Sequence, residues 1–458
     1  MSSHRLFGTD GVRGVVNVDL TPEFTVRLSL AIASYFKNGS RIVVGRDYRA
    51  GSEFISKIVI GSLVSAGVKV YDAGLTPTPA LQYYVKSLGF DGGIMITASH
   101  NPPEYSGIKV VMSDGIEAPR EVEEEIESYF HELRFRRIPW HELRHQVIRL
   151  NDVNDFYVEG ILKLVDVEKI RRKPFKVIVD PANNVGGLTT PKLLRKLNVK
   201  VVTVNSDLSV EPYREPEPIK ENINYLSDLV RFFKADFAVA HDGDADRAIF
   251  VDDEGNIVLG DRSAVILCKH LILNRNEKSP KRVVTAVSSS TVVEDILSRY
   301  GVEVLWTKVG SVIIARTMLS IGALAGFEEN GGFMYPPHQY VRDGAMSTAL
   351  MLEYLAMSNR KLSEAHKEIP ARYVVKAKVP LTNRSKLPDL IDTLKSMYST
   401  YYRVIDVDGV KVITDSYWFL VRPSGTEPLI RVFVEGSDEG EVNETLNNLK
   451  QIIKEVLG

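Results

Sequence analysis

The chain has 458 residues, of which 44% are hydrophobic and 25% charged, and its formal net charge is −2. These values are typical of a soluble protein with several domains, and they give no reason to expect nucleic acid or an anionic membrane as a partner. The single cysteine, Cys268, excludes an internal disulfide and a thiolate metal cluster, and its apolar neighbours predict a buried thiol. The chain shows neither a signal peptide nor an apolar run long enough to cross a membrane, so we expect a cytoplasmic protein.

One pattern occurs three times: a β-branched strand, a polar or glycine-containing loop, an amphipathic helix and a second, valine-rich strand. Each copy has the length of a βαβ unit, whose two strands lie parallel in one sheet. We therefore predict an α/β fold of three successive α/β domains with mainly parallel mixed sheets. The predicted strand, helix and strand include residues 41–45, 55–63 and 68–70 in the first copy, 176–180, 193–194 and 199–201 in the second, and 282–285, 292–296 and 302–304 in the third.

The last part of the chain has a different pattern, which predicts a C-terminal α+β domain. A strand at 373–379 and a helix at 387–397 precede a hairpin at Asp408 and Gly409, and two strands on either side of 422–428 precede a last helix at 442–456. The expected domains are 1–150, 151–252, 253–368 and 369–458.

A densely charged segment, 120–149, follows the first repeat, and we interpret it as a solvated helix and linker. Residues 141–145 within it read H-E-L-R-H, which on a helix would bring two imidazoles together around the zinc ion of a protease. The motif follows Pro139, no apolar helix continues around it, and no third ligand stands at a recognised spacing. We therefore disfavour a zinc protease.

The serine loop, residues 97–102, reads T-A-S-H-N-P and follows a predicted buried strand at 92–96. The Asn-Pro pair forces a turn, so we expect Ser99 to be exposed, with its hydroxyl available for covalent chemistry. Neighbouring side chains on an extended chain point to opposite sides, so Ser99 and His100 are not expected to pair as in a hydrolase. Taken alone, the loop is also compatible with plain turn chemistry.

The aspartate loop, residues 241–247, reads H-D-G-D-A-D-R between two predicted strands and is the most specific motif. Carboxylates at Asp242, Asp244 and Asp246 can converge on one hard cation and leave part of its shell open, which favours Mg²⁺. A calcium EF-hand would need glycine at the position of Arg247 and helices on both sides. A solvated acidic turn is the remaining alternative.

Three further loops carry candidate ligand groups. The arginine loop, residues 422–428 (R-P-S-G-T-E-P), places a guanidinium, two hydroxyls and backbone amides at a hairpin tip and so predicts a phosphate cradle, without the tail of a Walker A loop. Residues 8–14 (G-T-D-G-V-R-G) add Arg13 in a glycine-rich segment. The glutamate loop, residues 326–332 (G-F-E-E-N-G-G), offers two carboxylates and an amide, which suit hydroxyl or ammonium groups. Taken alone, this loop is equally compatible with a solvated turn.

A serine nucleophile, a Mg²⁺ site and an anion cradle together indicate phosphoryl transfer. The serine, aspartate, glutamate and arginine loops, in this order and over essentially the whole chain, resemble those of the α-D-phosphohexomutase family, which includes phosphoglucomutases, phosphomannomutases and phosphoglucosamine mutases. The resemblance implies reversible conversion of a hexose or hexosamine 6-phosphate to the 1-phosphate. The phosphoryl group would pass through a phosphoserine and a sugar bisphosphate, which also acts as activator.

The resemblance also implies residue roles. Ser99 would carry the phosphoryl group, and the metal ligands would be Ser99, Asp242, Asp244 and Asp246. Lys109, Arg13 and His100 would act beside the reacting groups. The substrate would be bound by Arg247, Lys308, Gly310, Glu328, Glu329, Asn330, Arg422, Ser424, Gly425 and Thr426. The implied partner is a small-molecule phosphosugar, without nucleic acid or membrane, and the implied state is a monomer or homodimer.

Two features bear on the sugar. Many bacterial relatives have G-E-x-S-G-H in the glutamate loop, whereas Asn330 and Gly332 stand at the serine and histidine positions here, and His338 is too distant to be aligned with that histidine. The opening G-T-D-G-V-R-G resembles the phosphoglucosamine mutase branch, and Glu329 is placed to pair with a 2-ammonium group unless it faces away from Glu328. Glucose and mannose phosphates are alternative substrates, and a metal-dependent phosphatase and a non-catalytic sugar-phosphate-binding protein are alternative functions.

Overall fold

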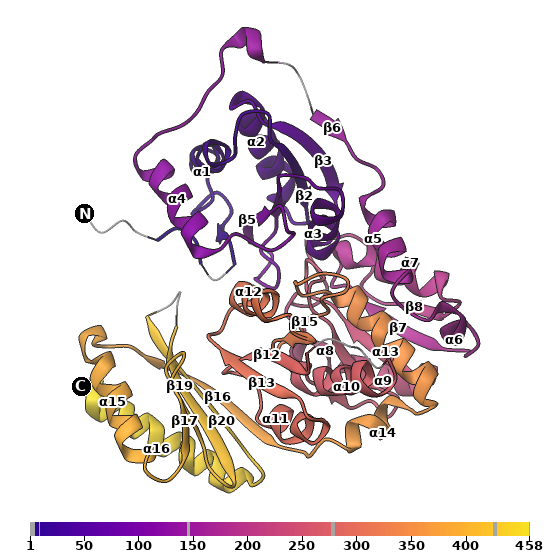
Figure 1. Cartoon of the computed structure of the whole chain (residues 1–458), viewed down its shortest axis with the longest axis vertical. Coiled ribbons are helices and arrows are strands. Elements are labelled where there is room, and N and C mark those ends of the chain that lie inside the picture. Colours follow the sequence, from indigo (N-terminus) through magenta and orange to yellow (C-terminus); the bar gives the residue numbers. More distant parts are fainter. Residues whose placement is uncertain (1–4, 9, 144–146, 276–279, 425–427, 458) are drawn as a thin grey trace.

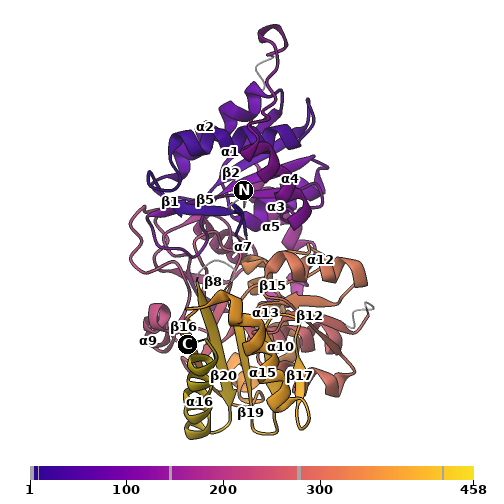
Figure 2. The ribbon, with the colours of Figure 1, turned by 90° about the vertical axis from the view of Figure 1, so that its left-hand side faces the viewer.

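The computed structural model describes residues 5–8, 10–143, 147–275, 280–424 and 428–457. Its described strands form four sheets. The second sheet includes β11 (Ile257–Val258), which lies beyond residue 252, where we expected the second segment to end. Figure 1 shows the N-terminal segment at the top, the second and third segments packed together below it, and the C-terminal segment beside the third. Figure 2, turned by 90°, again shows the N-terminal segment above the rest.

The first sheet has the strand order β1-β5-β4-β2-β3-β6. β4, β2, β3 and β6 run parallel, and β5 is antiparallel to β1 and β4. Its strands are β1 (Val12–Val15), β2 (Arg41–Arg46), β3 (Lys69–Leu75), β4 (Gly92–Ile96), β5 (Tyr105–Met112) and β6 (Val147–Arg149). The helices of this segment are α1 (Pro22–Tyr35), α2 (Ser52–Ser65), α3 (Thr78–Ser87), α4 (Arg120–His131) and η1 (Trp140–Glu142).

The charged segment at 120–149 is only partly the linker that we expected. Its end, residues 147–149, forms β6, which extends the first sheet by pairing in parallel with β3. The backbone groups of an unpaired sheet edge need hydrogen-bond partners, and a short strand supplies them even where its side chains are exposed. His141 and Glu142 lie on the exposed η1, and His145 lies outside the described residues.

The second sheet has the order β11-β10-β9-β7-β8, in which β9, β7 and β8 are parallel and β10 is antiparallel to β9 and β11. Its strands are β7 (Lys176–Asp180), β8 (Lys200–Thr203), β9 (Phe237–Ala240), β10 (Ile249–Asp252) and β11 (Ile257–Val258). The helices of this segment are α5 (Val153–Leu162), α6 (Val167–Arg171), η2 (Val185–Leu188), α7 (Thr190–Lys196), α8 (Lys220–Ile223) and α9 (Tyr225–Phe233).

The third sheet has the order β13-β12-β14-β15, in which β13, β12 and β14 are parallel and β15 is antiparallel to β14. Its strands are β12 (Arg282–Ala286), β13 (Glu303–Thr307), β14 (Ala325–Phe327) and β15 (Phe333–Met334). The helices of this segment are α10 (Gly260–Leu273), α11 (Val292–Leu297), η3 (Ser298–Tyr300), α12 (Ser311–Ile321), α13 (Gly344–Ser358) and α14 (Leu362–Lys367). All three predicted βαβ units are therefore confirmed, with parallel pairing of β2 with β3, β7 with β8 and β12 with β13.

The C-terminal sheet is antiparallel throughout, in the order β16-β20-β19-β18-β17. Its strands are β16 (Tyr373–Pro380), β17 (Arg403–Ile405), β18 (Val410–Ile413), β19 (Tyr417–Pro423) and β20 (Leu429–Gly436). The helices of this segment are η4 (Arg384–Lys386), α15 (Leu387–Tyr398) and α16 (Glu439–Leu457). This arrangement confirms the predicted α+β domain and completes the predicted fold class.

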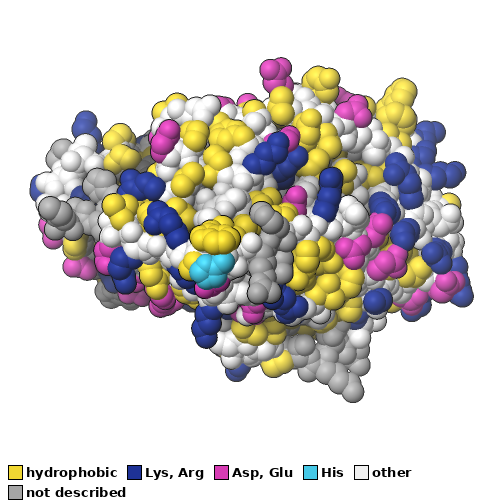
Figure 3. All heavy atoms as spheres, turned by 90° about the horizontal axis from the view of Figure 1, so that it is seen from above, with side chains coloured by type: hydrophobic (Ala, Val, Ile, Leu, Met, Phe, Trp, Pro, Cys, Tyr) yellow, Lys and Arg dark blue, Asp and Glu magenta, His cyan; other side chains and the backbone are white. Residues whose placement is uncertain are grey.

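The hydrophobic cores show how the segments join. The second and third share one core, which includes Val177, Val283 and the fully buried Cys268, whose predicted burial is confirmed. The C-terminal segment has a core of its own and meets the third through a cluster that includes Val287 and Trp418. Figure 3 views the outer side of the N-terminal segment, where hydrophobic side chains are scattered among lysines and arginines. None of the described helices combines the length and the apolar character needed to span a membrane.

Candidate active site

Ser99 lies in the turn that follows β4, and the prediction that it is exposed is wrong: its exposed fraction is 0%. The aspartate loop, which joins β9 to β10 in the second sheet, covers it. The Ser99 hydroxyl donates a hydrogen bond of 2.6 Å to Oδ2 of Asp242. The turn exposes the serine to a neighbouring domain rather than to solvent, and the sequence of the loop alone carries no sign of that neighbour.

Arg49 holds the backbone of the serine loop in place. Its guanidinium donates to the backbone carbonyls of Ser99, Asn101 and Pro102, and its Nε lies 2.9 Å from Oδ2 of Asp47. Both Arg49 and Asp47 are buried. A buried arginine that bonds several carbonyls of one turn holds the backbone of that turn in place, because each lost bond would leave a polar group unsatisfied.

His100 lies closer to Ser99 than we expected. Ser99 has a φ of 50°, in the left-handed region, so the chain is not extended here, and Nδ1 of His100 lies 3.4 Å from the Ser99 hydroxyl oxygen. Nδ1 also accepts a shorter bond of 2.8 Å from Nη2 of Arg247. Burial lowers the pKa of His100, and the neighbouring Arg247 and Arg13 lower it further, so the imidazole is neutral.

Asp242, Asp244 and Asp246 converge as predicted. One carboxylate oxygen from each lies within 4.8 Å of the others, and all three side chains are buried. Oδ1 of Asp244 and Oδ1 of Asp246 are buried without a hydrogen-bond partner. Burial raises the pKa of Asp246 well above its ordinary value, and the nearby Asp244 and Asp242 add to the rise. Unpartnered oxygens in a crowded acidic loop are the donor set that a hard divalent cation requires, so these residues fit a metal ion.

Lys109 points from β5 into this acidic group. Its Nζ lies 3.0 Å from Oδ2 of Asp10, 3.0 Å from Oδ2 of Asp244 and 3.7 Å from Oδ2 of Asp246, and the residue is 1% exposed. Burial by itself lowers the pKa of Lys109, but the carboxylates of Asp10 and Asp244 outweigh it and raise the pKa above the ordinary value. Lys109 is therefore a buried ammonium group beside the candidate metal site.

Arg13 reaches the serine loop from β1, which pairs with β5. Its guanidinium donates to Oδ1 of Asn101 at 2.7 Å and to the carbonyl of Ala98 at 3.2 Å, and its Nη2 lies 2.9 Å from Oδ2 of Asp10. Burial raises the pKa of Asp10, but Lys109 and other cations around it hold that pKa below the usual carboxyl range. The antiparallel β1-β5-β4 edge thus brings Arg13, Lys109 and Ser99 together.

Arg247, at the end of the aspartate loop, is also buried beside the serine. Its Nε lies 3.7 Å from Oδ2 of Asp242 and 3.9 Å from Oδ1 of Asp246. The loop is held from behind by His241, whose Nδ1 contacts the carbonyl of Arg247 at 2.7 Å and whose Nε2 contacts the hydroxyl of Thr190 at 2.9 Å. These contacts fix the direction in which the loop presents its charged side chains.

The two carboxylates of the glutamate loop face different surroundings. Glu328 is buried, and its Oε2 lies 3.0 Å from Nη1 of Arg342. Glu329 instead accepts a hydrogen bond of 2.9 Å from the hydroxyl of Ser288 and lies 3.5 Å from Nζ of Lys376 on β16. Glu329 therefore points toward the C-terminal domain and away from Glu328, as neighbouring side chains on an extended chain often do. Oδ1 of Asn330 accepts a hydrogen bond from the backbone amide of Gly332 within the same loop.

The remaining predicted residues lie where the third and C-terminal domains meet. Lys308 is exposed and Gly310 is buried in the loop before α12, and the amide of Val309 between them donates to Oδ2 of Asp408 at 3.1 Å. The same oxygen accepts a hydrogen bond of 2.9 Å from Nε of Arg422. Ser424 is buried beside Arg422 at the end of β19, and the predicted residues Gly425 and Thr426 lie outside the described residues.

Sequence reasoning missed three residues that the structure places around the serine and aspartate loops. Asp10 stands inside a motif that we had noted only for its arginine. Arg49 follows β2, and Arg342 precedes α13, in segments without a recognised motif. A signal for Arg342 is its place in V-R-D-G, directly before Asp343, whose side chain caps the next helix.

A buried serine hydroxyl, three convergent carboxylates with unpartnered oxygens, and several fixed cations form an arrangement suited to placing a phosphoryl group and offsetting its charge. The fold and this site define a phosphoryl-transfer enzyme. Comparison with known proteins narrows the class. Family models described as phosphoglucomutase/phosphomannomutase, alpha/beta/alpha domains I, II and III, match residues 4–137, 155–255 and 259–373, and the model of the C-terminal domain matches residues 358–451.

The chain is 52% identical to the phosphoglucosamine/phosphogalactosamine mutase of Sulfurisphaera tokodaii over 98% of this chain and 99% of the relative. It is 40% identical to the phosphoglucomutase/phosphomannomutase of Thermococcus kodakarensis over 99% of both chains. Among solved structures, a putative phosphomannomutase from Thermus thermophilus superimposes with a TM-score of 0.83 at 26% identity, over 99% of this chain and 100% of that one. The chain therefore belongs to the phosphoglucomutase/phosphomannomutase family, whose members are phosphohexomutases.

Proposed function

We propose that this phosphohexomutase acts on a hexosamine phosphate and moves the phosphoryl group between the 6- and 1-hydroxyls through Ser99. The choice of sugar rests on the relative at 52% identity, which is named for glucosamine and galactosamine phosphates. It does not rest on Glu329, because the carboxylate of that residue already has Ser288 and Lys376 as partners. The observation that carries the chemistry is the 2.6 Å contact between the Ser99 hydroxyl and Asp242 inside the acidic loop.

In this proposal Asp242, Asp244 and Asp246, together with an oxygen on Ser99, hold Mg²⁺. The ion, when bound, would draw negative charge from the transferring phosphoryl group. The unpartnered Oδ1 atoms of Asp244 and Asp246 support this assignment. Lys109 keeps its proton and places a positive charge beside the same loop.

Transfer from the enzyme to the sugar forms a bond between a sugar hydroxyl oxygen and phosphorus and breaks the bond between phosphorus and Oγ of Ser99. The hydroxyl loses its proton, and the freed serine oxygen regains one. Arg13 and Arg247 contact the serine loop and Lys109 contacts the aspartate loop, so positive charge lies near the reacting groups and favours the phosphorylated serine. Burial of Ser99 excludes water, which limits loss of the phosphoryl group as inorganic phosphate.

The reaction needs the sugar bisphosphate to bind in two orientations, so that each phosphate in turn reaches Ser99. Arg422 and Ser424, with Gly425 and Thr426, would hold the phosphate that does not react, and Glu328 would accept hydroxyls of the sugar. One cradle and one nucleophile then serve both halves of the reaction. The contacts of Arg422 with Asp408, and of Asp408 with Val309, connect this cradle with the loop that contains Lys308 and Gly310.

A phosphorus NMR time course tests the proposal. Enzyme with Mg²⁺ and a trace of sugar bisphosphate is offered glucosamine 6-phosphate, glucose 6-phosphate and mannose 6-phosphate in separate tubes. We expect the sugar 1-phosphate signal to grow fastest from the amino sugar and to be lost in Ser99→Ala. Fastest conversion of glucose or mannose phosphate would overturn the hexosamine assignment, and inorganic phosphate as the only product would indicate a phosphatase instead.

A further inference from the structure

The space beside Gly332, in the glutamate loop, is filled by the side chain of another residue. This chain has glycine, and so no side chain, at position 332. A Cβ atom added to Gly332 would lie 2.4 Å from Cδ and 2.7 Å from Cγ of Arg342. Such distances are too short for any side chain, because carbon atoms in contact stand at about 3.5–4.0 Å. The stem of Arg342 therefore occupies the space beside Gly332.

The guanidinium of Arg342 joins three carboxylates that come from three different parts of the chain. Its Nη2 lies 2.6 Å from Oδ2 of Asp246 and 3.1 Å from Oδ2 of Asp10, and its Nη1 lies 3.0 Å from Oε2 of Glu328. The Arg342 side chain is 6% exposed, and an antiparallel bridge to Met334 fixes its backbone. A planar guanidinium can hold several carboxylates in fixed directions at once, which a lysine ammonium group does less well.

The contacts of Arg342 decide how two loops present their ligand atoms. Oδ2 of Asp246 is bonded to Arg342, and the other oxygen, Oδ1, is buried without a hydrogen bond within the acidic loop. Because Oε2 of Glu328 is bonded as well, the carboxylate of the glutamate loop is held relative to the aspartate loop. The two loops belong to different sheets, β9–β10 and β14–β15, and Arg342 connects them.

We propose that Arg342, whose stem fills the space beside Gly332, is a positioning residue. It sets the geometry between the metal-binding aspartate loop and the sugar-binding glutamate loop, and this role rests on the proposed function. His338, a histidine of the same segment, does not take part in this arrangement: its Nδ1 lies 3.0 Å from Oδ2 of Asp343 and its ring stacks on Tyr83. An arginine keeps its proton at neutral pH, so what it supplies is position and charge, without proton transfer.

The test compares Arg342→Ala, Arg342→Lys, Gly332→Ala and the double variant Gly332→Ala/Arg342→Ala. Arg316→Ala serves as the matched control, because Arg316 is another arginine of the third domain that crosses to the first, where it pairs with Asp114 away from the serine. Three quantities are measured: the Mg²⁺ dissociation constant by calorimetry without sugar, KM and kcat for the amino sugar phosphate, and the thermal midpoint. The metal titration does not depend on activity.

Loss of an outer partner of a metal ligand typically reduces metal affinity or activity roughly 10–100-fold. We expect that loss in Arg342→Ala, with KM rising as well as kcat falling, partial recovery in Arg342→Lys, and no change in Arg316→Ala. Gly332→Ala should displace Arg342 and weaken Mg²⁺ binding in the native background, with no further effect once Arg342 is alanine.

Unchanged metal binding and kinetics in folded Arg342→Ala would overturn the proposal. If that variant does not fold, Arg342→Lys and Gly332→Ala decide, and native values in both would overturn it. Failure of the proposed function is distinguishable from failure of this inference. If the native enzyme converts no sugar phosphate, the reaction is wrong, whereas the metal titrations of the variants still show whether Arg342 positions Asp246.

Discussion

Asp10 forms ion pairs with three cations around the site. Its Oδ2 lies 3.0 Å from Lys109, 2.9 Å from Arg13 and 3.1 Å from Arg342, and its Oδ1 is buried without a partner. Buried cations of this kind are stable only while their carboxylates remain, because removal of one partner leaves a charge that neither water nor protein offsets.

Asp10→Asn should therefore lower the free energy of unfolding substantially, although it changes the shape of the side chain little. The amide has nearly the volume of the carboxylate but no charge, so three cations lose part of their compensation. We expect the free energy of unfolding to fall by roughly 3–5 kcal/mol, as measured by urea denaturation. Asp228→Asn is the control, since the 83% exposed side chain of Asp228 forms a solvated pair with Arg231 and its loss should be undetectable. Equal effects of the two changes would contradict the role of Asp10.

The aspartate and serine loops lie close together at Gly243. A Cβ atom there would lie 2.5 Å from the carbonyl oxygen of Ser99 and 3.1 Å from Nη2 of Arg49. A backbone carbonyl cannot move as a flexible side chain can, so only glycine allows the aspartate loop to contact the serine loop at this distance. The serine and the acidic ligands therefore keep their relation through the absence of a side chain.

Gly243→Ala should separate the two loops and disrupt the Ser99 to Asp242 hydrogen bond. The expected result is a strong loss of mutase activity and of Mg²⁺ affinity, measured by phosphorus NMR and calorimetry. Gly61→Ala is the matched control, because a Cβ on the exposed Gly61 of α2 meets nothing within 4 Å. Alanine in that helix should raise the free energy of unfolding by about 1 kcal/mol and leave activity native. Full activity in Gly243→Ala would show that the close approach is unnecessary.

The hairpin between β17 and β18 contributes Asp408, which lies between Arg422 and the loop before α12. A carboxylate that bonds both Nε of an arginine and a backbone amide of another domain holds that arginine in one orientation. This orientation is available before substrate arrives, which reduces the entropy lost when a phosphate binds.

We expect Asp408→Asn to raise KM for the sugar phosphate on the order of tenfold, with a smaller change in kcat, because one charge-assisted contact is lost. Steady-state kinetics measure it. Asp406→Asn, two residues earlier, removes an exposed partner of Lys395 and should leave KM unchanged. A lower KM in Asp408→Asn would mean that Asp408 competes with the phosphate rather than orienting Arg422.

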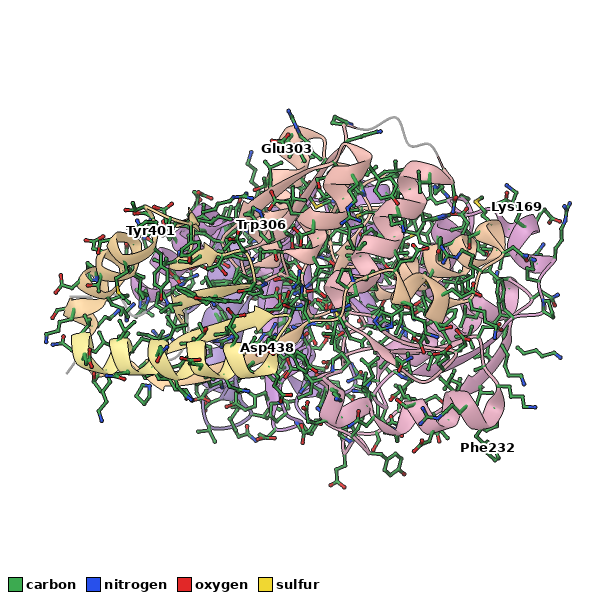
Figure 4. The ribbon with its side chains drawn as sticks, turned by 90° about the horizontal axis from the view of Figure 1, so that it is seen from below. Lys169, Phe232, Glu303, Trp306, Tyr401 and Asp438 are labelled. Carbon is green, nitrogen blue, oxygen red and sulfur yellow. The ribbon has the colours of Figure 1, made fainter. Side chains whose placement is uncertain are left out.

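At the scale of the whole molecule, the contact between the third and C-terminal domains contains a fully buried lysine. Nζ of Lys411 on β18 lies 4.0 Å from the ring centroids of both Trp306 and Trp418. It also donates a hydrogen bond of 2.6 Å to the carbonyl of Ser289. Figure 4 labels Trp306 where the C-terminal sheet meets the third domain. Burial lowers the pKa of Lys411 from 10.5 to about 7, although Glu435 opposes the change.

The lowered pKa of Lys411 makes the stability of the folded protein depend on pH. Between pH 7 and 10.5 the unfolded chain binds the Lys411 proton more tightly than the folded protein, so stability from this group rises with pH across that window. Relative to Lys411→Met, the thermal midpoint of the native protein should therefore increase as the pH is raised from about 7 toward 10. Lys450→Met, at an exposed position on α16, should follow the native protein at every pH. Parallel curves for Lys411→Met and the native protein would contradict the shift.

Local pattern in the sequence predicted the repeated units and the C-terminal domain, but it did not predict β6. The βαβ units and the C-terminal α+β domain were predictable because strand and helix periodicities depend on neighbouring residues. The convergence of Asp242, Asp244 and Asp246 was predictable for the same reason, since three carboxylates at alternate positions of one loop cannot lie far apart.

Contacts between domains were decided only by the tertiary structure. Burial of Ser99, the turn of Glu329 toward Lys376, and the meeting of Arg342 with Asp10 and Asp246 each join residues that are distant in the chain. Periodicity carries no information about such pairs, because their geometry depends on how whole sheets pack. The sequence by itself therefore determined which groups this phosphohexomutase possesses, and the packing of its domains decided which of them face one another.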